Sequence, residues 1–125
     1  MGKVVAFSNQ KGGVGKTSTC VNMAASLALR GYKVLLVDID AQGNSTTGMG
    51  IAKNTLARSI YNVLIDQTYI SDVIIPTSIE GLDILPSNID LAGAEVELVY
   101  LKNREKRLRM ALESVKNKYD YVMID

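Results

Sequence analysis

The sequence contains a single cysteine, Cys20, and few of the features that mark extracellular or membrane proteins. One cysteine cannot form an internal disulfide, and alone it cannot hold zinc or an iron–sulfur cluster. No apolar stretch approaches the roughly 20 residues that a membrane-spanning helix needs. Residues 1–10 lack the long apolar core and cleavage site of a secretory signal. We therefore expect a reduced, cytoplasmic protein that does not span a membrane.

Net charge is also nearly absent, since 14 Lys and Arg residues against 13 Asp and Glu residues give a formal charge of +1. This balance argues neither for nor against a nucleic-acid partner. A chain of 125 residues supplies at most one domain. On folding it would cover roughly two-thirds of its unfolded surface, which is enough for a real core.

Short apolar runs alternate along the chain with segments of helical periodicity. The expected strands span residues 4–7, 34–37, 82–85 and 121–124, and the first two suit burial on both faces of a sheet. The expected helices span residues 17–30, 56–64, 91–100 and 103–118. Residues 41–50 predict a loop, and residues 70–76 fit either a helical turn or a strand. Strands alternating with helices predict an α/β fold with a parallel sheet.

Several side chains are expected to set the faces and ends of these helices. Gly31 stands where a helix-terminating glycine belongs, and Thr55 is a candidate N-cap. The stripe expected to face the core in the first helix consists of Val21, Ala24, Ala25, Ala28 and Leu29. The corresponding stripe in the last helix consists of Leu108, Ala111, Leu112 and Val115. The many Lys and Arg residues of that last helix are more typical of a solvated face than of a phosphate-binding surface.

Residues 11–17, which read Lys-Gly-Gly-Val-Gly-Lys-Thr, lie between a predicted strand and a predicted helix, as a phosphate-binding loop does. Glycines permit the tight turn that gathers amide N–H groups around an anion, and the helix N-terminus adds its dipole. Lys16 supplies a mobile cation for the β- and γ-phosphates, the Thr17 hydroxyl suits Mg²⁺, and Ser18 is placed to reach the α-phosphate. The predicted phosphate-binding residues are Lys11, Gly12, Gly13, Val14, Gly15, Lys16, Thr17 and Ser18.

The match to the pattern G-x-x-x-x-G-K-[ST] is imperfect, because Gln10 occupies the first glycine position. A glycine-rich turn with chance lysines is the simplest alternative, and the strand–loop–helix context counts against it. A dinucleotide-binding fold is another alternative, and its phosphate-binding loop has the pattern G-x-G-x-x-G. The run from Gly13 reads G-V-G-K-T-S and lacks the last glycine.

Two aspartates follow predicted strands. Asp40 stands beyond the carboxyl end of the strand at residues 34–37, where α/β sheets bind ligands, although aspartates are also common in turns. Asp125 ends the apolar run at residues 121–124. Asp38 we expect to have a structural role.

The loop with Lys11 and its double glycine resembles the deviant Walker A motif of the ParA/MinD family of ATPases. Residues 34–44, 91–98 and 119–125 also resemble motifs of that family, within which the likeness is to the Soj/ParA chromosome-partitioning branch. Ala41 stands where the family commonly has proline. The resemblance covers essentially the whole chain. It implies an α/β P-loop NTPase fold, a three-layer sandwich with a mostly parallel sheet that ends here after the Walker B strand. Residues 1–125 would form the N-terminal part of a single ATPase domain.

The resemblance also implies roles for individual residues. Lys11 would reach across a dimer interface to the partner's phosphates, as an arginine finger does. Asp40 would position the attacking water or the magnesium shell, and Asp125 matches the Walker B aspartate that holds Mg²⁺ through water. The implied catalytic set is Lys11, Lys16 and Asp40, and the implied metal set is Thr17, Asp40 and Asp125.

The activity implied is binding and hydrolysis of Mg-ATP to ADP and phosphate, with nucleotide-dependent homodimerisation that drives chromosome or plasmid partitioning. The implied partners are a ParB/Spo0J-like protein and non-specific DNA bound through later sequence, and the implied location is the cytoplasm, associated with the nucleoid. A truncated ATP-binding module without turnover and a MinD-type cell-division ATPase are the alternatives. A sheet that ends at Asp125 is expected to leave an open edge and to self-associate.

Overall fold

The computed structural model describes residues 3–7, 14–39, 43–51, 58–64, 68–87 and 104–125. Its elements in chain order are β1 (Lys3–Ala6), α1 (Val14–Leu29), β2 (Val34–Val37), α2 (Asn44–Gly48), α3 (Ile60–Leu64), η2 (Ile70–Asp72), β3 (Ile75–Pro76), β4 (Leu82–Leu85), α5 (Arg104–Glu113), η3 (Lys116–Lys118) and β5 (Tyr121–Ile124).

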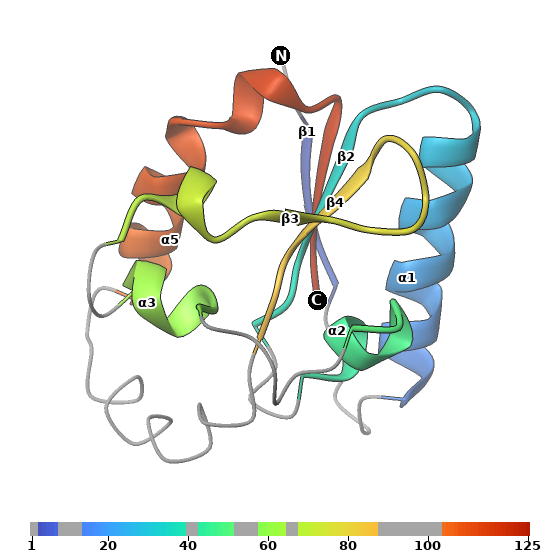
Figure 1. Cartoon of the computed structure of the whole chain (residues 1–125), viewed down its shortest axis with the longest axis horizontal. Coiled ribbons are helices and arrows are strands. Elements are labelled where there is room, and N and C mark those ends of the chain that lie inside the picture. The colour runs from blue at the N-terminus through green and yellow to red at the C-terminus, as the bar shows by residue number, and fades with distance from the viewer. Residues whose placement is uncertain (1–2, 8–13, 40–42, 52–57, 65–67, 88–103) are drawn as a thin grey trace.

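Within the described ranges the strands form one five-stranded sheet in the order β1-β5-β2-β4-β3. All neighbouring pairs are parallel except β3 and β4, which are antiparallel. Helices α1 and α2 lie on one side of this sheet, and α3 and α5 lie on the other (Figure 1). The expected α/β fold with three layers and a mostly parallel sheet is therefore confirmed.

Each face of the sheet carries its own apolar core. The residues buried between the sheet and α1 are Cys20, Ala24, Ala28, Val34, Leu36, Leu82, Ile84 and Met123. The residues buried on the opposite face, under α3 and α5, are Leu35, Val37, Ile60, Val63, Leu64, Ile70, Val73, Leu85, Leu112, Val115 and Val122. Alternate residues of β2 thus enter the two cores, as the pleat of a doubly covered strand requires.

Helix α1 follows the predicted pattern with two differences. Ala24 and Ala28 are buried and Gly31 takes a positive φ of 95°, as expected of a helix-terminating glycine. Leu29 is 78% exposed, so its place in the inward stripe was wrong. The helix also begins at Val14 rather than Thr17, and so includes Gly15 despite the poor helix propensity of glycine.

The expected loop at residues 41–50 was wrong in its second half, where the structure has the short helix α2. Gly43 precedes the helix with φ 64° and ψ 39°, a left-handed conformation that favours glycine. A five-residue helix has little stability of its own. It forms because the Ser45 and Thr46 side chains bond distant carboxylates, which composition alone does not reveal.

The α3 side of the fold contains further corrections. Ser59 lies outside the helix, its hydroxyl accepts a hydrogen bond from Tyr61 N at 3.2 Å, and α3 begins at Ile60. The expected continuous helix from residue 56 was therefore wrong, and Thr55 lies outside the described residues. Residues 70–76 contain both alternatives, the turn η2 and the strand β3. The expected helix at residues 91–100 also lies outside the described part of the chain.

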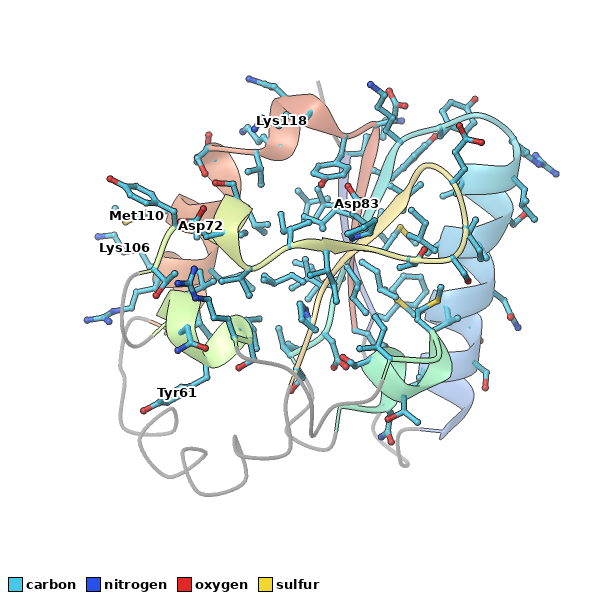
Figure 2. All side chains as sticks on the ribbon, in the orientation of Figure 1. Tyr61, Asp72, Asp83, Lys106, Met110 and Lys118 are labelled. Carbon is cyan, nitrogen blue, oxygen red and sulfur yellow. The ribbon has the colours of Figure 1, made fainter. Side chains whose placement is uncertain are left out.

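Helix α5 ends at Glu113, earlier than the predicted 118, and η3 completes the segment. Its expected inward stripe is confirmed, since Leu112 and Val115 are buried and Leu108 and Ala111 pack against the same core. Figure 2 shows Lys106 and Met110 on the outer side of this layer, away from the sheet, and Lys118 at the top of the view, on η3.

Tyr119, just before β5, is hydrogen-bonded to β4. Tyr119 donates its phenolic hydrogen to Asp83 Oδ2 at 2.8 Å. Burial, then this hydrogen bond and the charge of Asp83, raise the pKa of the Tyr119 phenol well above its usual range. The hydroxyl therefore stays protonated and available as a donor.

Strand β1 lies at one edge of the sheet and, among the described strands, pairs only with β5. Val4 is 51% exposed and Val5 is 37% exposed, so the expected burial of this strand on both faces was wrong. The apolar pattern of residues 4–7 cannot report which strands have neighbours on both sides. An exposed apolar edge strand is a template for pairing with another chain.

We predict that the 125-residue chain self-associates through β1 and that Val4→Lys abolishes this association, because a charge on an edge strand opposes pairing. Sedimentation velocity over a range of protein concentrations measures the effect. Leu29→Lys, at a more exposed apolar site on α1, is the control and should still associate. A wild-type chain that sediments as a monomer throughout would contradict the prediction.

Candidate phosphate-binding site at the carboxyl edge of the sheet

The head of α1 lies at the carboxyl edge of the parallel strands, next to α2 (Figure 1). Val14, Gly15 and Lys16 occupy its first turn, and Thr19 Oγ1 donates to Gly15 O at 2.9 Å, which shows helical geometry from Gly15 onward. Ser18 is exposed. The first-turn amides of this helix are those that have no partner within the helix itself, and they suit an anion.

Thr17 supplies the clearest sign of a ligand at this edge. Its Oγ1 is buried and, within the described part of the chain, has no hydrogen-bond partner. A buried hydroxyl without a partner costs about 1–3 kcal/mol, so such groups in native proteins usually form a hydrogen bond or bind an ion or water. Hydroxyl oxygen is a ligand that Mg²⁺ accepts.

Asp125 is buried at the end of β5, and both its main-chain N–H and its carbonyl are hydrogen-bonded to the end of β2 or just beyond it. Its N–H donates to Val37 O at 2.8 Å, and its carbonyl accepts from Ile39 N at 3.0 Å. Its carboxylate accepts a hydrogen bond from Ser45 Oγ, and Ser45 is itself fully buried. Mg²⁺ is commonly held through one or two carboxylates together with substrate phosphates. Thr17 and Asp125 fit such a site by their chemistry and by their place at one edge of the sheet.

Asp38, at the end of β2, is the second buried carboxylate at this edge. Its Oδ2 accepts from Thr46 N at 2.9 Å and from Thr46 Oγ1 at 2.7 Å. Thr46 Oγ1 in turn accepts from Ser87 N at 2.9 Å. One threonine therefore joins the ends of β2 and β4, and these contacts agree with the structural role expected of Asp38.

Not every predicted site residue can be located. Lys11, Gly12, Gly13 and Asp40 lie outside the described residues, and their roles stay predictions. The structure brings the head of α1, α2 and the buried Asp125 to one edge, with α1 in contact with both α2 and β5. The roles of Lys16, Thr17, Ser18 and Asp125 also stay predictions.

Ser45, Thr46 and Ser87 are buried polar residues of this edge that sequence reasoning missed. The Ser and Thr residues after Asn44 contributed only to the composition of an expected loop. A usable signal was present nonetheless. Hydroxyl residues a few positions after a strand-ending aspartate can return to bond that aspartate, as Thr46 does to Asp38.

A cavity of about 600 Å³ lies elsewhere, between α3, η2 and α5 in the layer opposite α1. Its lining residues are Val63, Thr68, Tyr69, Ile70, Lys106, Arg107, Met110, Ala111 and Ser114. Arg107 Nη1 donates to Leu64 O at 2.8 Å, and Lys116 pairs with Glu113 at 2.9 Å. These contacts favour the interpretation from the charge pattern, in which one face of this helix packs on the core and the charged face is solvated.

We predict that Thr46→Val lowers the free energy of unfolding by about 2–3 kcal/mol, because a buried carboxylate loses a hydroxyl donor. Urea denaturation measures the change. Thr47→Val is the matched control on the exposed side of the same helix and should stay within about 0.5 kcal/mol of wild type. Equal losses in both variants would show that the Thr46–Asp38 contact does not stabilise this edge.

The chain matches the family model described as an AAA domain (AAA_31) over residues 2–125. It is 54% identical over its whole length to the sporulation initiation inhibitor protein Soj of Bacillus subtilis, of which it covers 49%. It is 47% identical to the chromosome partitioning protein ParA of Myxococcus xanthus, matching 100% of this chain and 44% of that protein. The chain thus spans about half the length of these curated relatives.

Solved structures agree with the fold. A cobyrinic acid a,c-diamide synthase from Mycobacterium smegmatis, with bound ADP and magnesium, is 42% identical with a TM-score of 0.90, over 100% of this chain and 51% of that one. The cell division ATPase MinD of Pyrococcus furiosus is 29% identical with a TM-score of 0.82, over 100% of this chain and 50% of that one. No helix among the described residues is long and apolar enough to cross a membrane. The chain belongs to the AAA_31 family of AAA domains and is ParA/Soj-like within it.

Proposed function

We propose that this chain is the nucleotide-binding N-terminal part, residues 1–125, of an ATPase domain that binds Mg-ATP and hydrolyses it to ADP and phosphate. The observation that carries the proposal is the buried, unpartnered Thr17 hydroxyl at the head of α1, within the described residues. A similar chain, 42% identical, binds ADP and magnesium. That similarity supports the same ligand class here.

Each group has a role that its chemistry suits. The first-turn amides of α1 and the Lys16 ammonium bind the phosphates, and Lys11 is the cation delivered from a second copy. Thr17 and Asp125 would hold Mg²⁺, and Asp40 is the third metal residue that the sequence predicts. When bound, the ion neutralises phosphate charge that builds up during hydrolysis. Asp40 orients the attacking water.

For the whole protein we propose nucleotide-dependent homodimerisation that serves chromosome or plasmid partitioning, with non-specific DNA and a ParB-like protein as partners. The similarity to Soj and to a chromosome partitioning protein ParA supports this branch of the family. The proposed location is the cytoplasm, at the nucleoid. Because the chain spans about half of these relatives, turnover belongs to the whole protein and phosphate binding to this chain.

We predict that Lys16→Ala weakens binding of Mg-ATP to the chain by about 100-fold or more, because a phosphate loses its cationic partner. Lys11→Ala is the matched control, since its ammonium acts on the partner's nucleotide, and binding to the isolated chain should change by less than about threefold. Isothermal titration calorimetry measures both. Equal losses in the two variants would exclude the role of Lys11 in a second copy, and no loss in either would exclude the loop as the phosphate site.

We predict that Asp40→Ala in the whole protein lowers ATP turnover by about 100-fold while the ATP-bound dimer accumulates, because the water loses its orienting carboxylate but binding groups remain. Steady-state phosphate release and size-exclusion chromatography with ATP measure the two effects. Turnover at the wild-type rate would contradict the role of Asp40.

A further inference from the structure

Helix α2 presents two adjacent hydroxyl residues to two different carboxylates. Thr46 bonds Asp38 at the end of β2, and Ser45 Oγ donates to Asp125 Oδ2 at the end of β5. Both hydroxyl residues are fully buried, so neither bond is exchanged freely with bulk water. The proposed function uses Asp125 and leaves Ser45 without a role.

The segment between β2 and α2 is held to Asp125 at both of its ends. At its start, Ile39 N donates to Asp125 O at 3.0 Å, and at its end Ser45 Oγ bonds the Asp125 carboxylate. The Asp38–Thr46 bond closes the same segment across eight positions. Asp40 belongs to this segment in sequence. The Ser45–Asp125 hydrogen bond therefore links the Asp125 carboxylate to α2, which directly follows the segment that contains Asp40 in sequence.

We propose that Ser45 is a positioning residue for Asp125: its hydroxyl orients the carboxylate toward bound Mg-nucleotide and couples it to the segment with Asp40. The proposal rests on the proposed function, because it assigns a partner to one of its metal residues. Groups that orient a metal-binding carboxylate typically change metal affinity by about 10–100-fold when removed. A serine that only satisfied a buried carboxylate would change stability and leave the magnesium dependence alone.

The test is the magnesium dependence of fluorescent ADP binding to the 125-residue chain. Ser45→Ala should raise the Mg²⁺ concentration at half-maximal binding by about tenfold, while affinity measured in excess EDTA changes by less than about twofold. Ser45→Thr keeps the hydroxyl and should restore the wild-type midpoint. Ser59→Ala, at a buried serine whose hydroxyl bonds Tyr61 N instead, is the matched control and should leave the midpoint unchanged.

A second measurement needs no nucleotide. Amide hydrogen exchange of residues 43–48 in the free chain should accelerate to the same extent in Ser45→Ala, in Asp125→Ala and in the double variant, because each removes the donor or the acceptor of one shared bond. A wild-type chain that binds no Mg-nucleotide would refute the proposed function, and with it the orienting role, while the exchange data decide the coupling by themselves. An unchanged magnesium midpoint in Ser45→Ala, or exchange effects that add in the double variant, would overturn the inference.

Discussion

Among the residues that the structure describes, two carboxylates are buried at the carboxyl edge of the sheet, Asp38 and Asp125, and they set the constraint on which the rest of the structure depends. A charged group removed from water is stable in a fold only when it is paired or hydrogen-bonded. The main-chain N–H groups of Asp38, Ile39 and Asp125 donate to carbonyls of neighbouring strands or strand ends rather than to these carboxylates. Helix α2 supplies the Ser45 and Thr46 donors, and those same bonds hold a helix too short to be stable alone.

This mutual dependence connects the layers of the molecule. Helix α2 contacts α1, at the head of which the Thr17 hydroxyl lies, and through its side chains it reaches the ends of β2, β4 and β5. Residues from distant parts of the chain are therefore held together at the proposed phosphate site. The opposite layer, with α3 and α5, builds a separate core and is tied to the edge mainly through the sheet. Changes in that layer should affect stability more than ligand binding.

Much of this fold could be predicted from the sequence where local pattern and tertiary role coincide. The runs of β2, β4 and β5 are apolar because both faces of those strands are buried, so their positions were confirmed. The pattern failed at β1, which has the same composition but lies at an edge, and at Leu29, which continues a helical stripe past the end of the core. The edge position of β1 and the exposure of Leu29 both depend on tertiary neighbours, which the local sequence does not encode. The cap at Ser59 was missed because it depends on bonds within its own turn that an apolar pattern does not encode.

The candidate site could likewise be predicted only where its residues form a recognisable local motif. The loop motif and the strand-ending aspartates predicted a phosphate site at the carboxyl edge of the sheet, where the structure places the head of α1 and Asp125. Ser45 could not be predicted, because its partner lies 80 positions away, whereas Thr46 follows its partner Asp38 by eight positions and was missed although that spacing is a usable signal. The most direct measurement is a crystal structure of the 125-residue chain with Mg²⁺ and a non-hydrolysable ATP analogue. We predict phosphates at the head of α1, Thr17 Oγ1 on the ion and Asp125 facing it across water. An analogue bound elsewhere, or a Thr17 hydroxyl directed away from the ion, would contradict the proposed site.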